Sequence, residues 1–102
     1  MNHAFHPDAL AEYAAAVRAY EESQTGLGAR FIEHIEAAIA AVSSSPERWP
    51  ILEQDVRRRL TRIFPFAILY TVEENYVLIV AVMHCHRKPG YWHTRVGTTA
   101  TK

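Results

Sequence analysis

The chain has 102 residues, of which 49% are hydrophobic and 22% charged. This length is typical of one small domain, and the apolar content excludes intrinsic disorder. Its 11 basic residues balance 11 acidic ones, and a net charge of zero argues against a strongly basic nucleic-acid binder. The single cysteine, Cys85, excludes an internal disulfide and fits a reducing compartment.

The first half of the chain predicts a pair of helices. Residues 2–6 are compatible with a short strand, and Pro7 is typical of a first helical position. Apolar residues then recur at helical spacing over residues 10–20 and again over residues 31–42. The glycine-containing segment between them is short, so we expect an antiparallel helical hairpin.

The second half predicts a sheet. Two prolines exclude regular structure from residues 46–50. Runs of branched and aromatic residues then predict strands at residues 56–63, 66–72 and 76–85, with a last short edge strand at residues 91–96. The third of these is apolar almost throughout, which is typical of a central strand covered on both faces.

These elements predict an α+β fold, with an N-terminal antiparallel helical hairpin packed on a small antiparallel sheet of three to four strands. Residues 1–96 would form a single domain and residues 97–102 a polar C-terminal tail. The first residues lack the basic and apolar regions of a signal peptide, and no apolar run approaches the roughly 20 residues of a membrane helix. We therefore expect a soluble cytoplasmic protein that does not interact with membranes.

The zero net charge conceals an uneven distribution along the chain. Residues 1–55 contain nine acidic and three basic residues, whereas residues 56–102 contain two acidic and eight basic ones. The basic residues cluster and the acidic ones are spread out, so the sheet half is the part predicted to meet an anionic partner.

The order of short motifs resembles a known family. Pro-x-x-Trp-Pro occupies residues 46–50, Phe-Pro-Phe opens a strand at residues 64–66, and His-x-x-Arg-x-Pro follows a hydrophobic strand at residues 84–89. An aromatic pair and Arg95 then close the pattern. This order resembles the ParE/RelE superfamily, the toxins of bacterial type II toxin–antitoxin systems that include plasmid stabilisation proteins. The resemblance covers residues 3–95 and is closer to ParE.

The resemblance implies two alternative activities. ParE-like members bind and inhibit DNA gyrase without a known chemical step or cofactor, whereas RelE-like members cleave mRNA on the ribosome. Both kinds are neutralised by a cognate antitoxin protein. We expect a gyrase-inhibiting toxin that is not an enzyme. The first alternative is a ribosome-dependent mRNA endonuclease, and the second is an inert toxin-like domain that binds only an antitoxin or a second copy of itself as a homodimer.

A nuclease would need a general base, a general acid and a cation at the phosphate. The candidates for these catalytic roles are Arg62, His84, Arg87 and Tyr91. However, RelE-like nucleases typically carry an arginine directly after the aromatic residue of the second strand, where this chain has Ala67. The chain also has only two lysines, which further disfavours the nuclease.

The candidate partner-binding residues lie in the basic half, and Arg87 is the strongest because a guanidinium is suited to bidentate anion recognition. The full set is Arg57, Arg58, Arg59, Arg62, His84, Arg87, Tyr91, Trp92 and Arg95. Strand alternation places Arg57 and Arg59 on one face and Arg58 on the other. The alternative interpretation is an edge strand kept soluble by charge.

Three further groups have a functional and a structural interpretation. His84, His86 and His93 could hold a metal ion, but this spacing is weak support, and no metal is predicted. Cys85 is expected to be a buried apolar thiol. Trp49, Tyr91 and Trp92 could offer stacking platforms, although closing a small core is the favoured role of Trp92.

Overall fold

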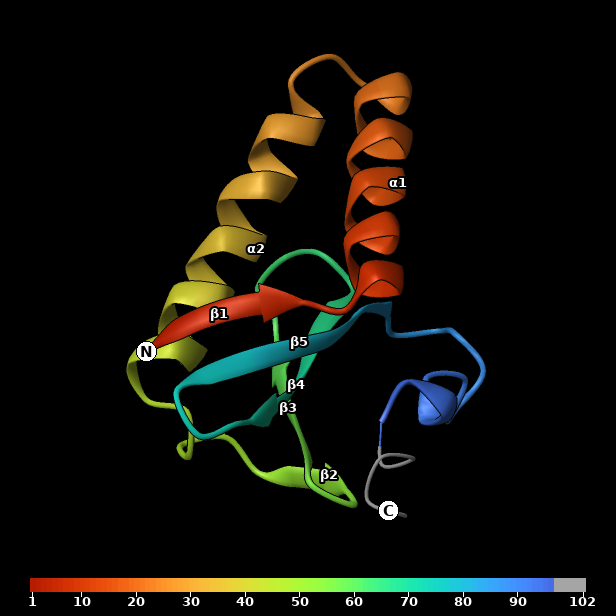
Figure 1. Ribbon diagram of the computed structural model, residues 1–102. Helices are drawn as coiled ribbons and strands as arrows, with labels where there is room; N and C mark the ends of the chain where they lie inside the picture. The colour runs from red at the N-terminus through yellow and green to blue at the C-terminus, as the bar shows by residue number, and fades with distance from the viewer. Residues whose placement is uncertain (97–102) are drawn as a thin grey trace.

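The computed structural model describes residues 1–96, and it packs two helices on one face of a five-stranded sheet (Figure 1). The elements in chain order are β1 (Asn2–Phe5), α1 (Pro7–Ser23), α2 (Leu27–Ser44), β2 (Ile51–Glu53), β3 (Val56–Leu60), β4 (Phe66–Val72), β5 (Tyr76–His84) and the short 3-10 helix η1 (His93–Arg95). The predicted polar tail, residues 97–102, lies outside the described residues.

The predicted α+β class and the helical hairpin are confirmed, but the sheet is larger than expected and mixed. Its strand order is β1-β5-β4-β3-β2, and β1 runs parallel to β5 while the other neighbours are antiparallel. The predicted central strand is confirmed, since β5 lies between β1 and β4. The sequence-based count of three to four strands was too low because β2 has only three residues and directly follows a proline.

Polar contacts fix both ends of α1. The His6 side chain caps its start by accepting a hydrogen bond from the Asp8 backbone N–H at 3.0 Å. Beyond its end, the Glu21 carboxylate accepts from the backbone N–H groups of Gly26 and Gly28 at 3.0–3.1 Å. Gly26 has φ of 89°, a conformation that glycine adopts at little cost. These contacts hold the turn of the hairpin.

Two strand predictions in the basic half were wrong, one in its end point and one altogether. The strand expected at residues 56–63 ends at Leu60, because the Thr61 hydroxyl lies 3.0 Å from the carbonyl oxygens of Phe64 and Phe66 and closes a compact loop. Residues 91–96 form no strand. They carry η1, which is placed by the burial of Trp92 rather than by strand pairing.

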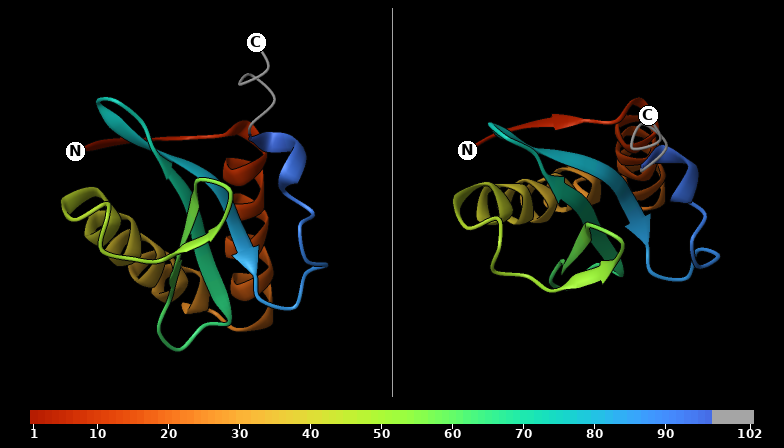
Figure 2. Two further views of the ribbon diagram at one scale, coloured as in Figure 1. Left: turned by 90° about the horizontal axis from the view of Figure 1, so that it is seen from below. Right: turned by 60° about the horizontal axis from the view of Figure 1, so that its bottom comes forward.

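The two faces of the sheet carry separate cores. Phe66, Ile68 and Tyr70 of β4 face the helices and pack against residues such as Phe31 and Ile35. Val56, Ala67, Leu69, Val80 and Ala81 face the opposite side and pack against Trp92. Figure 2 shows the chain after β5, in blue, turning back toward the start of α1. In residues 1–96, no helix is long and apolar enough to cross a membrane.

Candidate functional site

Two of the candidate arginines hold the loop that precedes the sheet. The Arg57 guanidinium donates hydrogen bonds to the carbonyl oxygens of Glu47 at 3.2 Å and Trp49 at 2.7 Å. The Arg59 guanidinium lies 5.1 Å from the centre of the Trp49 ring. Arg57 and Arg59 pair with Tyr70 and Ile68, so both lie on the helix-covered face, whereas Arg58 is exposed on the other. The predicted alternation is confirmed. The Arg57 and Arg59 side chains stabilise the loop that contains Trp49.

Arg95 is engaged within the molecule. Its guanidinium forms two hydrogen bonds to the Glu12 carboxylate, at 2.8 and 3.0 Å, and a third to the Val80 carbonyl oxygen at 3.0 Å. The hydrogen bonds to Glu12 raise the pKa of Arg95, so the guanidinium stays charged. Only 11% of the Arg95 side chain and 15% of the Glu12 side chain are exposed. This ion pair fastens the end of the described chain to α1 and β5.

Glu12, the partner of Arg95, is a residue of this region that the sequence analysis missed. Its carboxylate also accepts a hydrogen bond from the Val82 backbone N–H at 3.0 Å, so one side chain joins α1 to β5 and to η1. The signal was present, because Glu12 falls on the inward stripe that contains Ala9, Tyr13 and Ala16. The predicted stripe began instead at Leu10, which is exposed.

Two arginine side chains lie close to the Tyr91 ring. The Arg87 guanidinium is 3.9 Å from the centre of the Tyr91 ring, and the Arg95 guanidinium is 5.0 Å from the same centre. The hydroxyl is buried close to the Glu12 carboxylate. Burial and, after it, the nearby Glu12 carboxylate raise the pKa of Tyr91 well above its ordinary value. The phenol is therefore neutral at physiological pH and turned away from solvent.

The histidine triplet predicted as a possible metal site is not assembled. The rings of His84 and His86 have centres 5.2 Å apart, and the His86 backbone N–H donates to Nδ1 of His84. His93 instead contacts the Glu53 carboxylate at 2.8 Å and packs against the Trp92 ring. Within residues 1–96, no three side chains of the metal-ligating types lie close enough to hold an ion.

Two further predictions for this region had opposite outcomes. Cys85 is exposed rather than buried, because β5 ends at His84 and the strand alternation stops there. Trp92 is only 1% exposed, which confirms that it closes a small core. In this structure a partner could reach Trp92 only through the residues that cover it.

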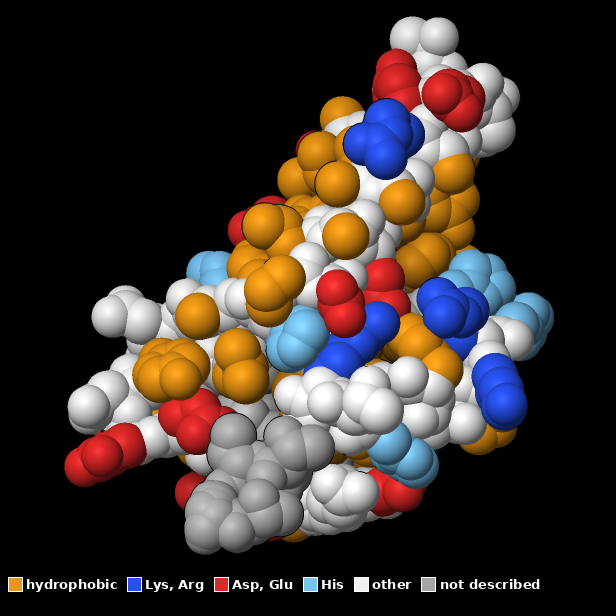
Figure 3. Space-filling view, turned by 45° about the vertical axis from the view of Figure 1, so that its right-hand side comes forward, with side chains coloured by type: hydrophobic (Ala, Val, Ile, Leu, Met, Phe, Trp, Pro, Cys, Tyr) orange, Lys and Arg blue, Asp and Glu red, His pale blue; other side chains and the backbone are white. Residues whose placement is uncertain are grey.

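The remaining candidates lie on two neighbouring loops. Arg62 belongs to the loop between β3 and β4, and Arg87 belongs to the turn after β5. The Cys85 backbone N–H donates to the Pro65 carbonyl oxygen at 2.8 Å and joins the two loops. In Figure 3, His, Lys and Arg side chains gather at one edge of the face shown, below the helical hairpin. The structure thus brings Arg62, His84 and Arg87 to one end of the sheet.

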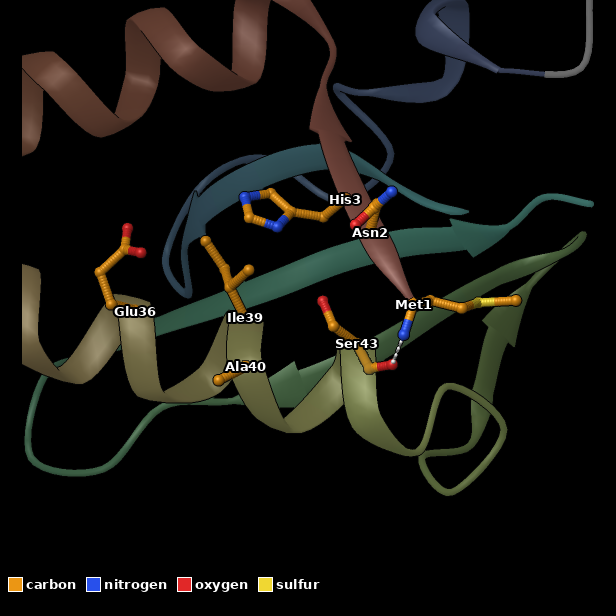
Figure 4. Close-up of a pocket in the computed structure, with 7 residues that line it drawn as sticks. All are labelled: Met1, Asn2, His3, Glu36, Ile39, Ala40 and Ser43. Carbon is orange, nitrogen blue, oxygen red and sulfur yellow. Dashed lines mark hydrogen bonds between the residues drawn. The ribbon is translucent and has the colours of Figure 1, made fainter. Parts of the chain in front are cut away.

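A hollow lies away from these residues, between β1 and α2 (Figure 4). Its lining includes His3, Glu36 and Ser43, and the Met1 amino group donates a hydrogen bond to the Ser43 carbonyl oxygen at 3.0 Å. None of the candidate residues lines it. This hollow is therefore separate from the candidate site residues.

Comparison with solved structures identifies the class of fold. The chain is similar to a protein in the chromosomal ParDE toxin–antitoxin system of P. aeruginosa, with a TM-score of 0.73 and 15% sequence identity. The match covers 82% of this chain and 95% of that one. Two helices on a sheet of this topology therefore form a ParE-like fold.

Comparison of the sequence with models of protein families identifies the family. The model of the family described as "ParE toxin of type II toxin-antitoxin system, parDE" matches residues 4–89. This chain belongs to that family, as the motif order predicted, and is closer to ParE than to RelE. No curated protein matches it.

Proposed function

We propose that this protein is the toxin of a type II toxin–antitoxin module, that it acts by binding and inhibiting DNA gyrase, and that a cognate antitoxin neutralises it. The family match over residues 4–89 carries the proposal. We also propose that the protein acts in the bacterial cytoplasm, that residues 1–96 form its single toxin domain, and that it uses no cofactor.

The state of the candidate catalytic residues supports binding rather than RNA cleavage. Ala67 is fully buried in β4, so no guanidinium projects from the position where RelE-like nucleases typically carry one. The Tyr91 hydroxyl is buried and has a raised pKa, which makes it a poor general base. Of the proposed nuclease set, Arg62 and Arg87 remain exposed as cations. His84 is then the only proton-transfer group of that set, and its Nδ1 already accepts a hydrogen bond from the His86 backbone N–H, so its Nε2 would have to serve as both general base and general acid.

Supercoiling assays test the target. Purified protein added to gyrase and relaxed plasmid should block supercoiling in a concentration-dependent manner. The cognate antitoxin is expected to be a short protein encoded by a neighbouring reading frame, and its addition should restore supercoiling. Mapping of mRNA ends after induction in cells is the companion measurement. Codon-phased mRNA cleavage with normal supercoiling would replace gyrase inhibition with the RelE-like activity.

Two outcomes would identify the inert alternative. Induction without any growth defect, together with tight binding to the neighbouring protein, would leave antitoxin binding as the sole function. A stable homodimer in light scattering that dissociates when the neighbouring protein is added would show that self-association uses the surface that the antitoxin covers.

A further inference from the structure

Ile63 has an unusual backbone and an unusual exposure. Its φ is 73°, in the left-handed region that a β-branched side chain rarely occupies. The Phe64 backbone N–H donates to the Arg62 carbonyl oxygen at 2.7 Å, which defines a γ-turn centred on Ile63. This turn with positive φ is rare and strained. Ile63 is also 74% exposed, more than any other large hydrophobic side chain in residues 1–96.

The surrounding structure holds this conformation in place. Phe64 is buried, and its ring packs against Tyr20, Phe31 and His34 at centre-to-centre distances of 5.0–5.4 Å. The γ-turn therefore sends Phe64 into the core and Ile63 outward. A glycine or asparagine would adopt this backbone more easily, so folding alone does not account for an isoleucine here.

Basic residues are exposed on the same two joined loops as this apolar side chain. The loop before β4 and the turn after β5 are joined by the hydrogen bond from Cys85 to Pro65. Together they expose what we call the Ile63 surface: Arg62, Ile63, Pro65, His86, Arg87 and Lys88. Neither loop contains an acidic residue. Arg62 and Lys88 form no ion pair within the described chain. Arg87 lies over the Tyr91 ring, and its one ion pair there is a long contact, 3.9 Å, with Glu12.

We propose that the Ile63 surface docks an acidic protein segment of the toxin's target, with Ile63 entering an apolar pocket and the three cations pairing with carboxylates around it. This inference rests on the proposed function as a toxin and adds the residues that meet the target. An apolar anchor with a charged rim is the usual anatomy of a protein interface. A nucleic acid would instead favour aromatic rings for stacking, and the Tyr91 ring is already covered by Arg87.

Two variants test the surface without threatening the fold. Ile63→Asn removes the apolar anchor and supplies a residue that tolerates positive φ, so its unfolding midpoint should equal or exceed that of the parent protein. Lys88→Glu reverses an exposed charge. The matched controls are Ile51→Asn, at a side chain 53% exposed on β2, and Arg18→Glu on the exposed side of α1.

Each protein is induced in cells to measure growth arrest, assayed for gyrase inhibition, and titrated with the neighbouring antitoxin. We expect Ile63→Asn and Lys88→Glu each to weaken growth arrest and gyrase inhibition at least tenfold, while antitoxin affinity and both controls stay within twofold. Inhibition by the parent protein should also weaken as salt is raised, because the docking is electrostatic.

The remaining outcomes separate the hypotheses. If the parent arrests growth without inhibiting gyrase, the proposed target fails, and the growth assay still judges the surface. Full activity of both variants would overturn the docking surface, and an equal loss of antitoxin binding would assign it to the antitoxin instead. Micromolar binding of the parent to a short DNA duplex or RNA strand, abolished by Lys88→Glu, would assign it to a nucleic acid. A parent that does not arrest growth would overturn both proposals.

Discussion

The two faces of the sheet are closed by very different parts of the chain. Two long helices cover one face, and their buried side chains form a broad aromatic and aliphatic core around Phe31 and Ile35. The opposite face is closed in residues 1–96 mainly by one short segment after β5, with Trp92 at its centre and Arg95 fastening it to Glu12. The helix-covered face therefore draws its stability from many contacts, whereas the opposite face depends largely on Trp92 and Arg95.

The largest expected effect is at Trp92. Trp92→Ala should lower the free energy of unfolding by about 3–5 kcal/mol, because it empties the centre of the smaller core. Urea titration followed by circular dichroism measures the change, and Ile35→Ala supplies the comparison on the helix-covered face. A loss below about 1 kcal/mol would show that the second face does not depend on this ring.

Removal of the charge that fastens the segment should have the next largest effect. Arg95→Met should cost about 2–3 kcal/mol, because it leaves the mostly buried Glu12 carboxylate without its cation. Glu12→Gln combined with Arg95→Met should recover part of this loss, since the second change removes the unpaired charge. Equal costs for the single and double variants would contradict this account of the ion pair.

A smaller effect is expected on the helix-covered face. Arg57→Met should cost about 1–2 kcal/mol, because the carbonyl oxygens of Glu47 and Trp49 lose a charged donor. Arg58→Met, at the neighbouring exposed position, should change stability by no more than about 0.5 kcal/mol. Comparable losses in thermal unfolding for the two variants would contradict the loop-holding role of Arg57.

The smallest effect is a pH dependence shared by both faces. Burial raises the pKa of Tyr13 of α1, whose hydroxyl donates a hydrogen bond to the Glu36 carboxylate of α2. Burial also raises the pKa of Tyr91 on the other face of the sheet. A raised pKa in the folded state means that the stabilisation is complete below the unfolded value of about 10 and is lost as the pH rises above it. Urea midpoints measured from pH 8 to 11 should fall above pH 10, and Tyr91→Phe should reduce the fall. A flat profile would contradict the raised pKa values.

Sequence patterns predicted the long elements well because their side chains repeat with a clear period. β4 was predicted to the residue, since Phe66–Val72 is apolar and branched throughout and has loop residues at both ends. Residues 2–6 were interpreted only as compatible with a short strand, and the four residues of β1 carry no information on whether they pair parallel or antiparallel. Residues 91–96 were predicted as a strand, yet burial of Trp92 and the Arg95 ion pair outweigh strand propensity there.

The site was predicted only in part. The basic half and the exposed position of Arg87 could be predicted from charge clustering and strand ends. The roles of Arg57 and Arg95 could not, because their partners are a loop carbonyl and a carboxylate distant in the sequence. The conformation of Ile63 could not be predicted, because an isoleucine in the sequence gives no sign of a positive φ. The burial of the neighbouring Phe64 in the core imposes it.

The parallel pairing of β1 with β5 has a consequence for how the protein is made. Asn2 pairs with Tyr76 and Phe5 with Ile79, so β1 finds its partner only after the helical hairpin and β2–β4 have been synthesised. Contacts this distant in sequence close late and slow folding. The helical hairpin can form early from local contacts, but the sheet that carries Arg62 and Arg87 cannot be completed before β5 has been synthesised. A nascent chain therefore lacks the complete sheet, and with it the Ile63 surface, until β5 has been synthesised.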